Sequence, residues 1–286
     1  MSTRLRVQVA LTVTVTFWSA AFVAIRHAAP AYPIGSFLLL RFLIPAVLLG
    51  AWAVRSRTLL PPAGDRRGVI ALGGFFVLYI GLLAWGERSV DAGTASMLAE
   101  TSPILTYALA AIVLREGSSR QLLVGLLVSF AGAVLIAREH GGGGLSLSTG
   151  ALLVLGAAAS QAVMFVIQKP LLSRQTAFQV VTQATIVGAV ATAPFGAQLV
   201  DAVRTAPASA TWALVFLALT TGLVSYVTLA YAMARSESTG ATSSVLYLVP
   251  PGAVLISWAL LDEVPTALTL VGGVLAVAGV VIAQRR

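Results

Sequence analysis

The sequence contains no cysteine and only two histidines, His27 and His140. The absence of cysteine excludes disulfide bonds and thiolate metal sites, and it leaves the cellular compartment undetermined. Both histidines lie near the ends of apolar segments, so a histidine-based metal site is not expected. No metal ligand is therefore assigned to any residue.

Charge is scarce as well. Only 10% of the 286 residues are charged and 58% are hydrophobic, whereas an ordinary soluble domain has about 25% charged residues. The mean hydropathy is +0.93, and so few charged groups cannot cover a surface that faces water. The net charge of +8 does not indicate nucleic-acid binding, because the basic residues stand at segment ends and form no basic stripe with stacking aromatics. These features predict an integral membrane protein.

Motifs for catalysis are missing too. The sequence has no phosphate-binding GxxxxGK[ST] loop, no nucleophile elbow and no HExxH, and no polar stretch is long enough to fold as a nucleotide-binding domain. We therefore expect no enzyme activity, no catalytic residue, no cofactor and no transport driven by ATP binding to this chain.

Long apolar runs without alternation predict membrane-spanning helices rather than barrel strands. Each run approaches the ~20 residues that cross a hydrocarbon core. The first follows Arg4 and Arg6 and continues to about Ile25, which is long enough for a retained helix instead of a cleaved signal peptide. The ten predicted spans are 7–26, 34–54, 68–86, 92–114, 120–137, 149–168, 177–197, 211–231, 239–260 and 267–283.

The basic residues predict the orientation. With a cytoplasmic N-terminus, thirteen Lys and Arg fall on inside segments and four on outside segments, and Arg41 stays within a helix. The positive-inside rule then places both termini in the cytoplasm, and we expect a multi-pass protein of a bacterial inner membrane.

The second half of the sequence repeats the first. Residues 79–136 align with 226–283 at a constant offset of 147, without a gap. Five helices is an odd number, so the second half enters the membrane from the opposite side, and the two repeats are predicted to be inverted. We expect repeats at 1–140 and 145–286, joined by the glycines at 141–144 and able to alternate in access to the two sides. The aligned pairs are Tyr79–Tyr226, Arg88–Arg235, Gly93–Gly240, Pro103–Pro250, Glu116–Glu263, Gly125–Gly272 and Gly132–Gly279.

Two charged residues lie within predicted spans. Glu100 is about nine residues into its helix, and Arg41 stands at a similar depth. An ionisable group inside a membrane is costly and therefore indicates a functional site. We predict that Glu100 contacts substrate, with proton exchange as a further role, and that Arg41 has a gating or structural role. The alternatives are a purely structural ion pair between the two, or an Arg41 side chain that snorkels toward the membrane surface.

Aromatic and amide side chains also fall in mid-membrane. Trp18, Tyr79, Tyr226 and Tyr247 are expected to line a central cavity, with Gln161 facing it from the sixth span. The alternative for the tyrosines is interhelical packing with the hydroxyl bonded to a backbone carbonyl.

Prolines interrupt the fourth and ninth predicted spans at matching positions, Pro103 and Pro250. Paired breaks in two halves indicate a moving or binding element. Small residues in the fifth span, Gly125 to Gly132, mirror those of the tenth, Gly272 to Gly279, and permit close helix packing. Scaffold packing is their expected role and dimerisation the second, so a monomer is favoured.

In these features the chain resembles the EamA-type permeases of the drug/metabolite transporter superfamily. Two positions depart from the family's usual pattern: Ser19 follows the first-helix tryptophan where glycine is usual, and Gln161 stands where tryptophan is common. The resemblance covers the whole chain and is carried by Phe17-Trp18-Ser19 with Phe22 and Arg26, by Leu40-Arg41-Phe42, by Ala92-Gly93 to Pro103, by Leu114-Arg115-Glu116, and by Gly125 to Gly132, with the pattern repeated near the C-terminus.

The resemblance implies an all-α carrier of ten transmembrane helices, with a central cavity formed by helices 1, 3, 4, 6, 8 and 9. It implies a secondary transporter that exports amino acids or similar small metabolites, most similar to the branch for aromatic and other apolar amino acids. The alternatives are a multidrug carrier, a sugar-phosphate carrier, or an intramembrane enzyme acting on lipids. The expected partners are a small-molecule substrate and the lipid bilayer.

Overall fold

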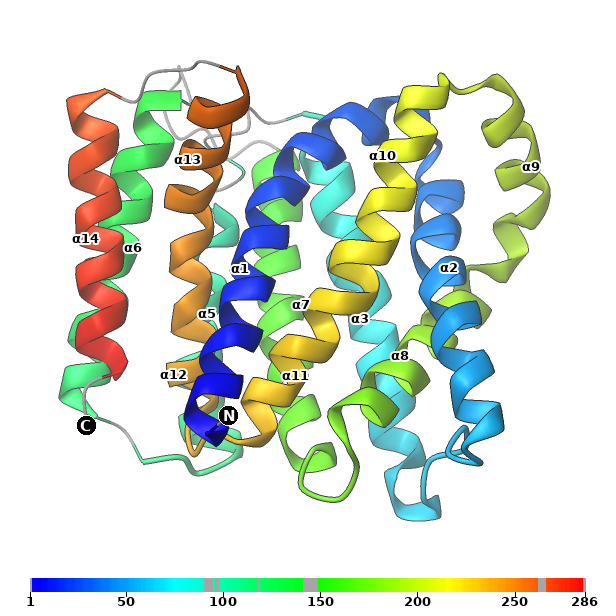
Figure 1. Ribbon diagram of the computed structural model, residues 1–286, viewed down its shortest axis with the longest axis horizontal. Coiled ribbons are helices and arrows are strands. Elements are labelled where there is room, and N and C mark those ends of the chain that lie inside the picture. Colours follow the sequence, from blue (N-terminus) through cyan, green and yellow to red (C-terminus); the bar gives the residue numbers. More distant parts are fainter. Residues whose placement is uncertain are drawn as a thin grey trace.

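The computed structural model describes residues 2–89, 95, 98–117, 119–140, 149–261 and 266–284. Over these residues the chain forms helices and no strand. The helices stand side by side, and both ends of the chain lie at the same, lower end of the bundle in Figure 1. The predicted glycine link at 141–144 lies outside the described residues, as do Gly93 and Glu263.

The first half is built from long helices. The helix α1 begins after Ser2, whose side-chain oxygen accepts a hydrogen bond from the backbone nitrogen of Leu5 at 3.3 Å, as an N-cap residue does. The elements are α1 (Thr3–Ala28), η1 (Ala29–Ala31), α2 (Ile34–Arg55), η2 (Ala63–Asp65), α3 (Arg66–Gly86), α5 (Ser102–Val113) and α6 (Arg120–His140).

The second half is more segmented. The helix α8 begins with a capping box in which Thr176 and Gln179 bond each other's backbone nitrogens. The elements are α7 (Thr149–Leu171), α8 (Ala177–Thr192), η3 (Ala193–Phe195), α9 (Gly196–Thr205), α10 (Ala208–Leu219), the π-helix η4 (Thr220–Ser225), α11 (Tyr226–Ala234), α12 (Thr239–Ser243), η5 (Ser244–Leu248), α13 (Val249–Leu261) and α14 (Ala267–Gln284).

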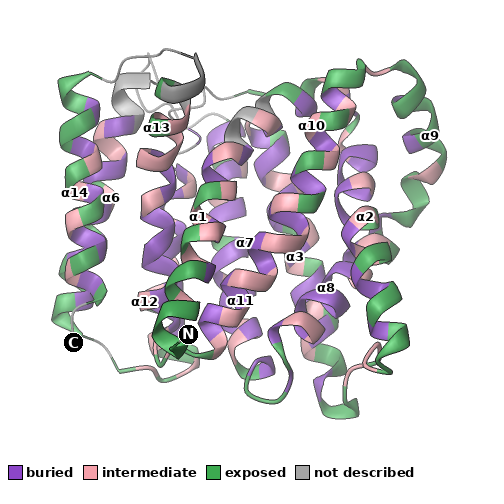
Figure 2. Cartoon of the chain, viewed as in Figure 1, coloured by how far each residue is buried: buried purple, intermediate pink, exposed green. Residues whose placement is uncertain are grey.

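The outside of the bundle is apolar and the inside holds polar groups. Large apolar side chains such as Ile112, Trp212 and Val274 are about 70% exposed on the helix exteriors, and Figure 2 shows exposed residues along the outer faces. Arg41, Glu100 and several glutamines and threonines are buried. Seven helical stretches in the described residues are long and apolar enough to cross a membrane. The chain is therefore an all-helical membrane protein.

Helices of the two halves pack mainly against each other. The helix α3 lies against α7 and α8, α2 against α8 and α10, and α1 against α10, α11 and α13. Many helices of the first half are therefore buried against helices of the second half.

The helices α6 and α14 form a tight antiparallel pair at one side of the bundle (Figure 1). A Cβ atom added at Gly125 would lie 2.4 Å from the backbone nitrogen of Ala283, and one added at Gly132 would lie 2.5 Å from that of Ala276. Ser129 donates a hydrogen bond to the Ala276 carbonyl at 3.1 Å. The small residues therefore serve close packing within the chain.

The predicted proline breaks coincide with helix starts. Pro103 lies in the first turn of α5, after a turn at Glu100 and Thr101. Pro250 lies in the first turn of α13, after the 3-10 turn η5. Proline is tolerated there because the first backbone nitrogens of a helix have no acceptor within it.

Two basic side chains bind helix ends at opposite ends of the bundle. Arg88, after α3, donates to the carbonyl of Ala29 at 2.7 Å and also to that of Tyr32. Lys169, near the end of α7, donates to the carbonyl of Met233 at 2.8 Å and also to that of Ser236. Each satisfies carbonyls that a helix end leaves without a partner.

Candidate functional site

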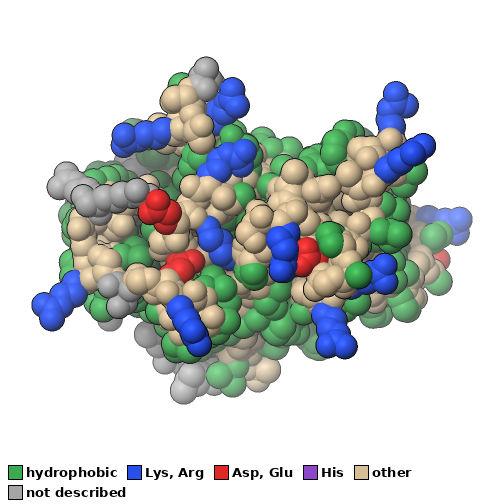
Figure 3. Space-filling model, turned by 90° about the horizontal axis from the view of Figure 1, so that it is seen from below, with side chains coloured by type: hydrophobic (Ala, Val, Ile, Leu, Met, Phe, Trp, Pro, Cys, Tyr) green, Lys and Arg blue, Asp and Glu red, His purple; other side chains and the backbone are tan. Residues whose placement is uncertain are grey.

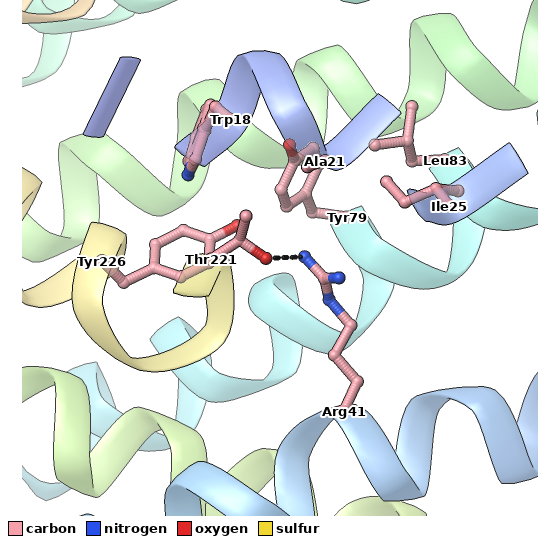
Figure 4. Close-up of a pocket in the computed structure, with 8 residues that line it drawn as sticks. All are labelled: Trp18, Ala21, Ile25, Arg41, Tyr79, Leu83, Thr221 and Tyr226. Carbon is pink, nitrogen blue, oxygen red and sulfur yellow. Dashed lines mark hydrogen bonds between the residues drawn. The ribbon is translucent and has the colours of Figure 1, made fainter. Parts of the chain in front are cut away.

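A small cavity lies between α1, α2, α3 and the junction of η4 with α11. Its volume is about 40 Å³, which is room for water molecules but far below the ~300 Å³ of a ligand pocket. It is lined by Trp18, Ala21, Ile25, Arg41, Tyr79, Leu83, Thr221 and Tyr226, shown in Figure 4.

The guanidinium of Arg41 reaches this cavity from α2 (Figure 4). The residue is only 5% exposed. Its Nη2 donates to Oγ1 of Thr221 at 2.8 Å, and that hydroxyl donates in turn to the carbonyl of Leu217 at 2.8 Å. Nη1 has no hydrogen-bond partner. No carboxylate in the described part of the chain lies within ion-pair distance of Arg41, and Glu87 acts on it only from farther away.

The π-helix η4 places Thr221 opposite Arg41. Its wider turns include a hydrogen bond from the Ser225 hydroxyl to the carbonyl of Thr220, five residues earlier, at 3.1 Å. Gly222 lets this turn approach α2, since a Cβ atom there would lie 3.4 Å from the Arg41 carbonyl. A π-turn inside an α-helix often marks a functional site.

Aromatic rings form the rest of the wall. Tyr226 packs edge-on against Trp18, with ring centroids 5.5 Å apart, and against Phe76 at 4.3 Å. Tyr79 and Tyr226 line the cavity together with Arg41. The indole nitrogen of Trp18 is buried without a partner. Three of the predicted aromatic residues thus meet Arg41 at one cavity.

Ser19 connects α1 to the start of α13. Its hydroxyl donates to the carbonyl of Val249 at 3.0 Å. A Cβ atom at Gly252 would lie 2.4 Å from this hydroxyl oxygen, so glycine at 252 makes room for the serine. The departure at Ser19 from the family pattern therefore has a structural use.

Glu100 and Tyr247 do not line this cavity. Glu100 is 6% exposed, and its Oε2 has no hydrogen-bond partner. Tyr247 is fully buried in a separate cluster with its ring 6.5 Å from that of Phe130, and its hydroxyl also has no partner. Glu100 and Tyr247 are electrostatic neighbours. Glu100 does not pair with Arg41, so the alternative of a structural ion pair was wrong.

The glutamines occupy other buried positions. Gln161, on α7, is 4% exposed and lies outside the set that lines the cavity. Gln183, on α8, is buried to the same extent, and both polar atoms of its amide lack a partner. Amide groups are thus available in the interior but do not join Arg41 in this conformation.

Thr221 is the cavity-lining residue that sequence reasoning missed. It shares a span with many other small polar residues, and nothing in the sequence marks a π-turn at Thr220–Ser225. The one signal that could have found Thr221 is its position five residues before Tyr226, a residue that the repeat alignment had singled out.

An apolar exterior around buried polar groups, with several helices long enough to span a bilayer, defines a multi-pass membrane protein. The model of the EamA-like transporter family matches residues 6–138 and again 148–284. The chain belongs to this family, as its sequence motifs predicted, and it is a transporter and not an enzyme.

Relatives of known sequence agree with this family. A protein of Streptantibioticus cattleyicolor named "Probable terminal-alkyne amino-acid exporter" is 38% identical over 97% of this chain and 93% of its own length. "Uncharacterized transporter YdfC" of Bacillus subtilis is 33% identical over 96% of this chain and 90% of its own. A crystal structure at 19% identity superposes with a TM-score of 0.78 over 98% of both chains, which shows the shared fold.

Proposed function

We propose that this protein is a secondary transporter that exports amino acids with apolar or aromatic side chains by alternating access. The cavity that holds the buried guanidinium of Arg41 among Trp18, Tyr79 and Tyr226 carries the proposal. Aromatic faces suit an apolar side chain, and a few convergent polar groups fix orientation in such sites. The similarity to a protein named as an amino-acid exporter supports the same substrate class.

The transport mechanism rests on two inverted repeats of five helices, ten in all. Three observations support this arrangement. The family model matches two consecutive segments of the chain. Ser129 and Ala276, 147 positions apart, touch where the antiparallel helices α6 and α14 cross. Tyr79 and Tyr226 have the same separation in sequence, and both line the cavity. A twofold axis in the membrane plane brings such residues together.

The chain ends are proposed to face the cytoplasm of a bacterial cell. Figure 3 views the bundle from the end that holds both termini and shows Lys and Arg side chains spread over that face. The predicted inside residues Arg55, Arg66 and Arg120 all stand at helix ends on this side (Figure 1). This distribution follows the positive-inside rule.

Alternating access requires the cavity to open to either side. At about 40 Å³ it is contracted around Arg41, so substrate entry needs the surrounding helices to separate. The cavity switches between the two sides of the membrane when contacts between the two halves break or form. One stands at the lower end, where Glu116 accepts hydrogen bonds from the backbone nitrogen of Thr239 at 2.7 Å and from its hydroxyl at 2.5 Å.

The composition of the cavity argues against one alternative substrate. A sugar phosphate carries about two negative charges, as phosphorylated side chains do, whereas Arg41 is the single basic residue that lines this cavity. A multidrug carrier of the same superfamily remains the second candidate, because the Trp18 and Tyr226 rings also suit apolar drugs.

Reconstitution of the purified chain in liposomes tests the function. Uptake of a panel of labelled amino acids is measured with and without a pH gradient, beside empty liposomes. Uptake of aromatic or branched amino acids above that of a cationic dye supports export of amino acids. Uptake of the dye alone supports the multidrug alternative, and no uptake of any compound contradicts the proposal.

A further inference from the structure

Two hydrogen-bond donors at the cavity have nothing to donate to. They are Nη1 of Arg41 and the indole nitrogen of Trp18, in residues 5% and 8% exposed. Leaving a buried donor unpaired costs about 1–3 kcal/mol, more for a charged group. Native proteins rarely accept this cost twice at one place without a function.

The two side chains that carry these donors line the same cavity from different helices. Figure 4 shows Trp18 on α1 above the cavity with its nitrogen directed downward, and Arg41 rising from α2 below it. The Thr221 hydroxyl is already engaged, because it accepts from Arg41 and donates to the carbonyl of Leu217. The wall therefore offers free donors, and it contains no carboxylate.

What the cavity lacks is a negatively charged acceptor. Trapped water would satisfy the two donors, but it would place no counter-charge within ion-pair distance of the buried guanidinium, on which Glu87 acts only from farther away. A carboxylate supplies both the acceptors and the counter-charge, because its two oxygens accept several hydrogen bonds and its charge balances Arg41. Such a pair is strong in a site from which bulk water is excluded.

We propose that the carboxylate of the transported amino acid binds between Arg41 Nη1 and Trp18 Nε1. This subsite rests on the proposed export of amino acids and assigns the orientation of the substrate. The carboxylate faces α1 and α2, and the apolar side chain lies along Tyr79 and Tyr226. Arg41 is then a substrate-binding residue, and Thr221 positions its guanidinium by accepting from Nη2.

The subsite predicts selectivity for the carboxylate. L-Phenylalanine should compete for transport, and so should 3-phenylpropionate, which keeps the carboxylate and lacks the amino group. Phenylethylamine and phenylalaninamide, which lack the carboxylate, should compete at least tenfold less well, since a hydrogen bond to a charged group contributes about 1.5–3 kcal/mol.

The experiment measures counterflow of labelled L-phenylalanine in liposomes containing the full chain, with these three compounds as competitors. Trp18→Phe keeps an aromatic ring and removes the N–H, and Arg41→Lys keeps the charge and removes the planar fork. Each should raise the KM for phenylalanine roughly tenfold. Each should also reduce the difference between phenylalanine and phenylethylamine in how strongly they compete for transport. Trp85→Phe, at a side chain 56% exposed on the exterior, is the matched control and should leave both unchanged.

The outcomes separate the subsite from the function. If the wild type transports phenylalanine but phenylethylamine competes equally, the subsite is wrong and export of amino acids stands. An unchanged KM in Trp18→Phe, the milder variant, also overturns it. If the wild type transports no amino acid, the proposed function fails and the subsite with it. Size-exclusion chromatography of each variant verifies folding. If Arg41→Lys does not fold, the KM of Trp18→Phe alone tests the subsite.

Discussion

Ser129 on α6 donates a hydrogen bond to the backbone carbonyl of Ala276 on α14, and the two residues stand 147 positions apart, which is the repeat offset. Under the proposed repeat, each occupies the same place in its own half of the chain. Two equivalent residues of inverted repeats can touch only close to the axis that relates the repeats. The α6–α14 pair is thus proposed as the fixed element around which the other helices move.

Close packing at this pair depends on glycine. Gly132→Ala should lower the free energy of unfolding by about 1–3 kcal/mol, the usual cost of overpacking, because the new Cβ would lie 2.5 Å from the Ala276 nitrogen and from the Gly272 carbonyl oxygen. Gly74→Ala is the control: it lies on the exposed face of α3 with no atom within 4 Å, and alanine there favours the helix. Thermal unfolding in detergent measures both. A Gly132→Ala midpoint at or above the wild-type value would show that the two helices are not in tight contact.

The aromatic wall should be needed for transport and not for folding. Trp18→Ala and Tyr79→Ala each remove a ring from the cavity, and we expect the transport rate to fall about tenfold, which corresponds to about 1.4 kcal/mol of lost contact energy. Trp212→Ala removes a ring that is 71% exposed on the outside and should leave the rate unchanged. Uptake of labelled amino acid, normalised to the amount of reconstituted protein, checks all three. Normal uptake by both cavity variants would end the aromatic-cavity hypothesis.

Glu100 is the predicted carrier of a proton. Glu100→Gln keeps the shape of the side chain and removes its ability to gain or lose a proton, so transport should lose its dependence on a pH gradient while counterflow without a gradient persists. Asp201→Asn, at an exposed residue of α9, serves as the control. A pH profile identical to that of the wild type would exclude the proton-carrying role.

A buried carboxylate connects the two halves at the lower end of the bundle. Asp65, only 2% exposed, pairs with Arg174 at 2.6 Å and accepts from Gln175 at 3.0 Å. Asp65→Asn should lower the thermal midpoint, because the remaining amide cannot balance Arg174. In a double-mutant cycle with Arg174→Gln the two losses should fall short of additivity by about 0.5–3 kcal/mol. Strict additivity would mean that the pair does not contribute to stability.

Helix content and family followed from the sequence because both depend on features that are local along the chain. The apolar runs predicted most helix positions, and the motifs around Trp18, Arg41 and Pro103 predicted the EamA family, which the family match confirms. The repeat offset also singled out Tyr79 and Tyr226, which line one cavity in the structure. A repeat makes equivalent residues visible without knowledge of the contacts.

The facing direction of each side chain was not predictable. Tyr247 and Gln161 were expected at the cavity but lie outside its wall. Helices that are apolar all round give no sequence signal for which face points inward, so the sequence could not show this. The offset also aligned Arg88 with Arg235, yet Arg88 binds carbonyls after α1 whereas Arg235 stacks on the Tyr231 ring at 3.5 Å. Opposite ends of the bundle give the two residues different neighbours.

The sequence by itself determined a membrane-spanning helical chain and its family, since hydropathy, charge and spacing act along one dimension. The tertiary structure alone decided that Arg41 meets Thr221 instead of Glu100, and that Trp18 and Arg41 present free donors to one cavity. The physical reason is that these contacts depend on how α1 and α2 rotate and pack against a π-turn in the other half. Such packing is a property of the whole bundle and is not encoded in any single segment.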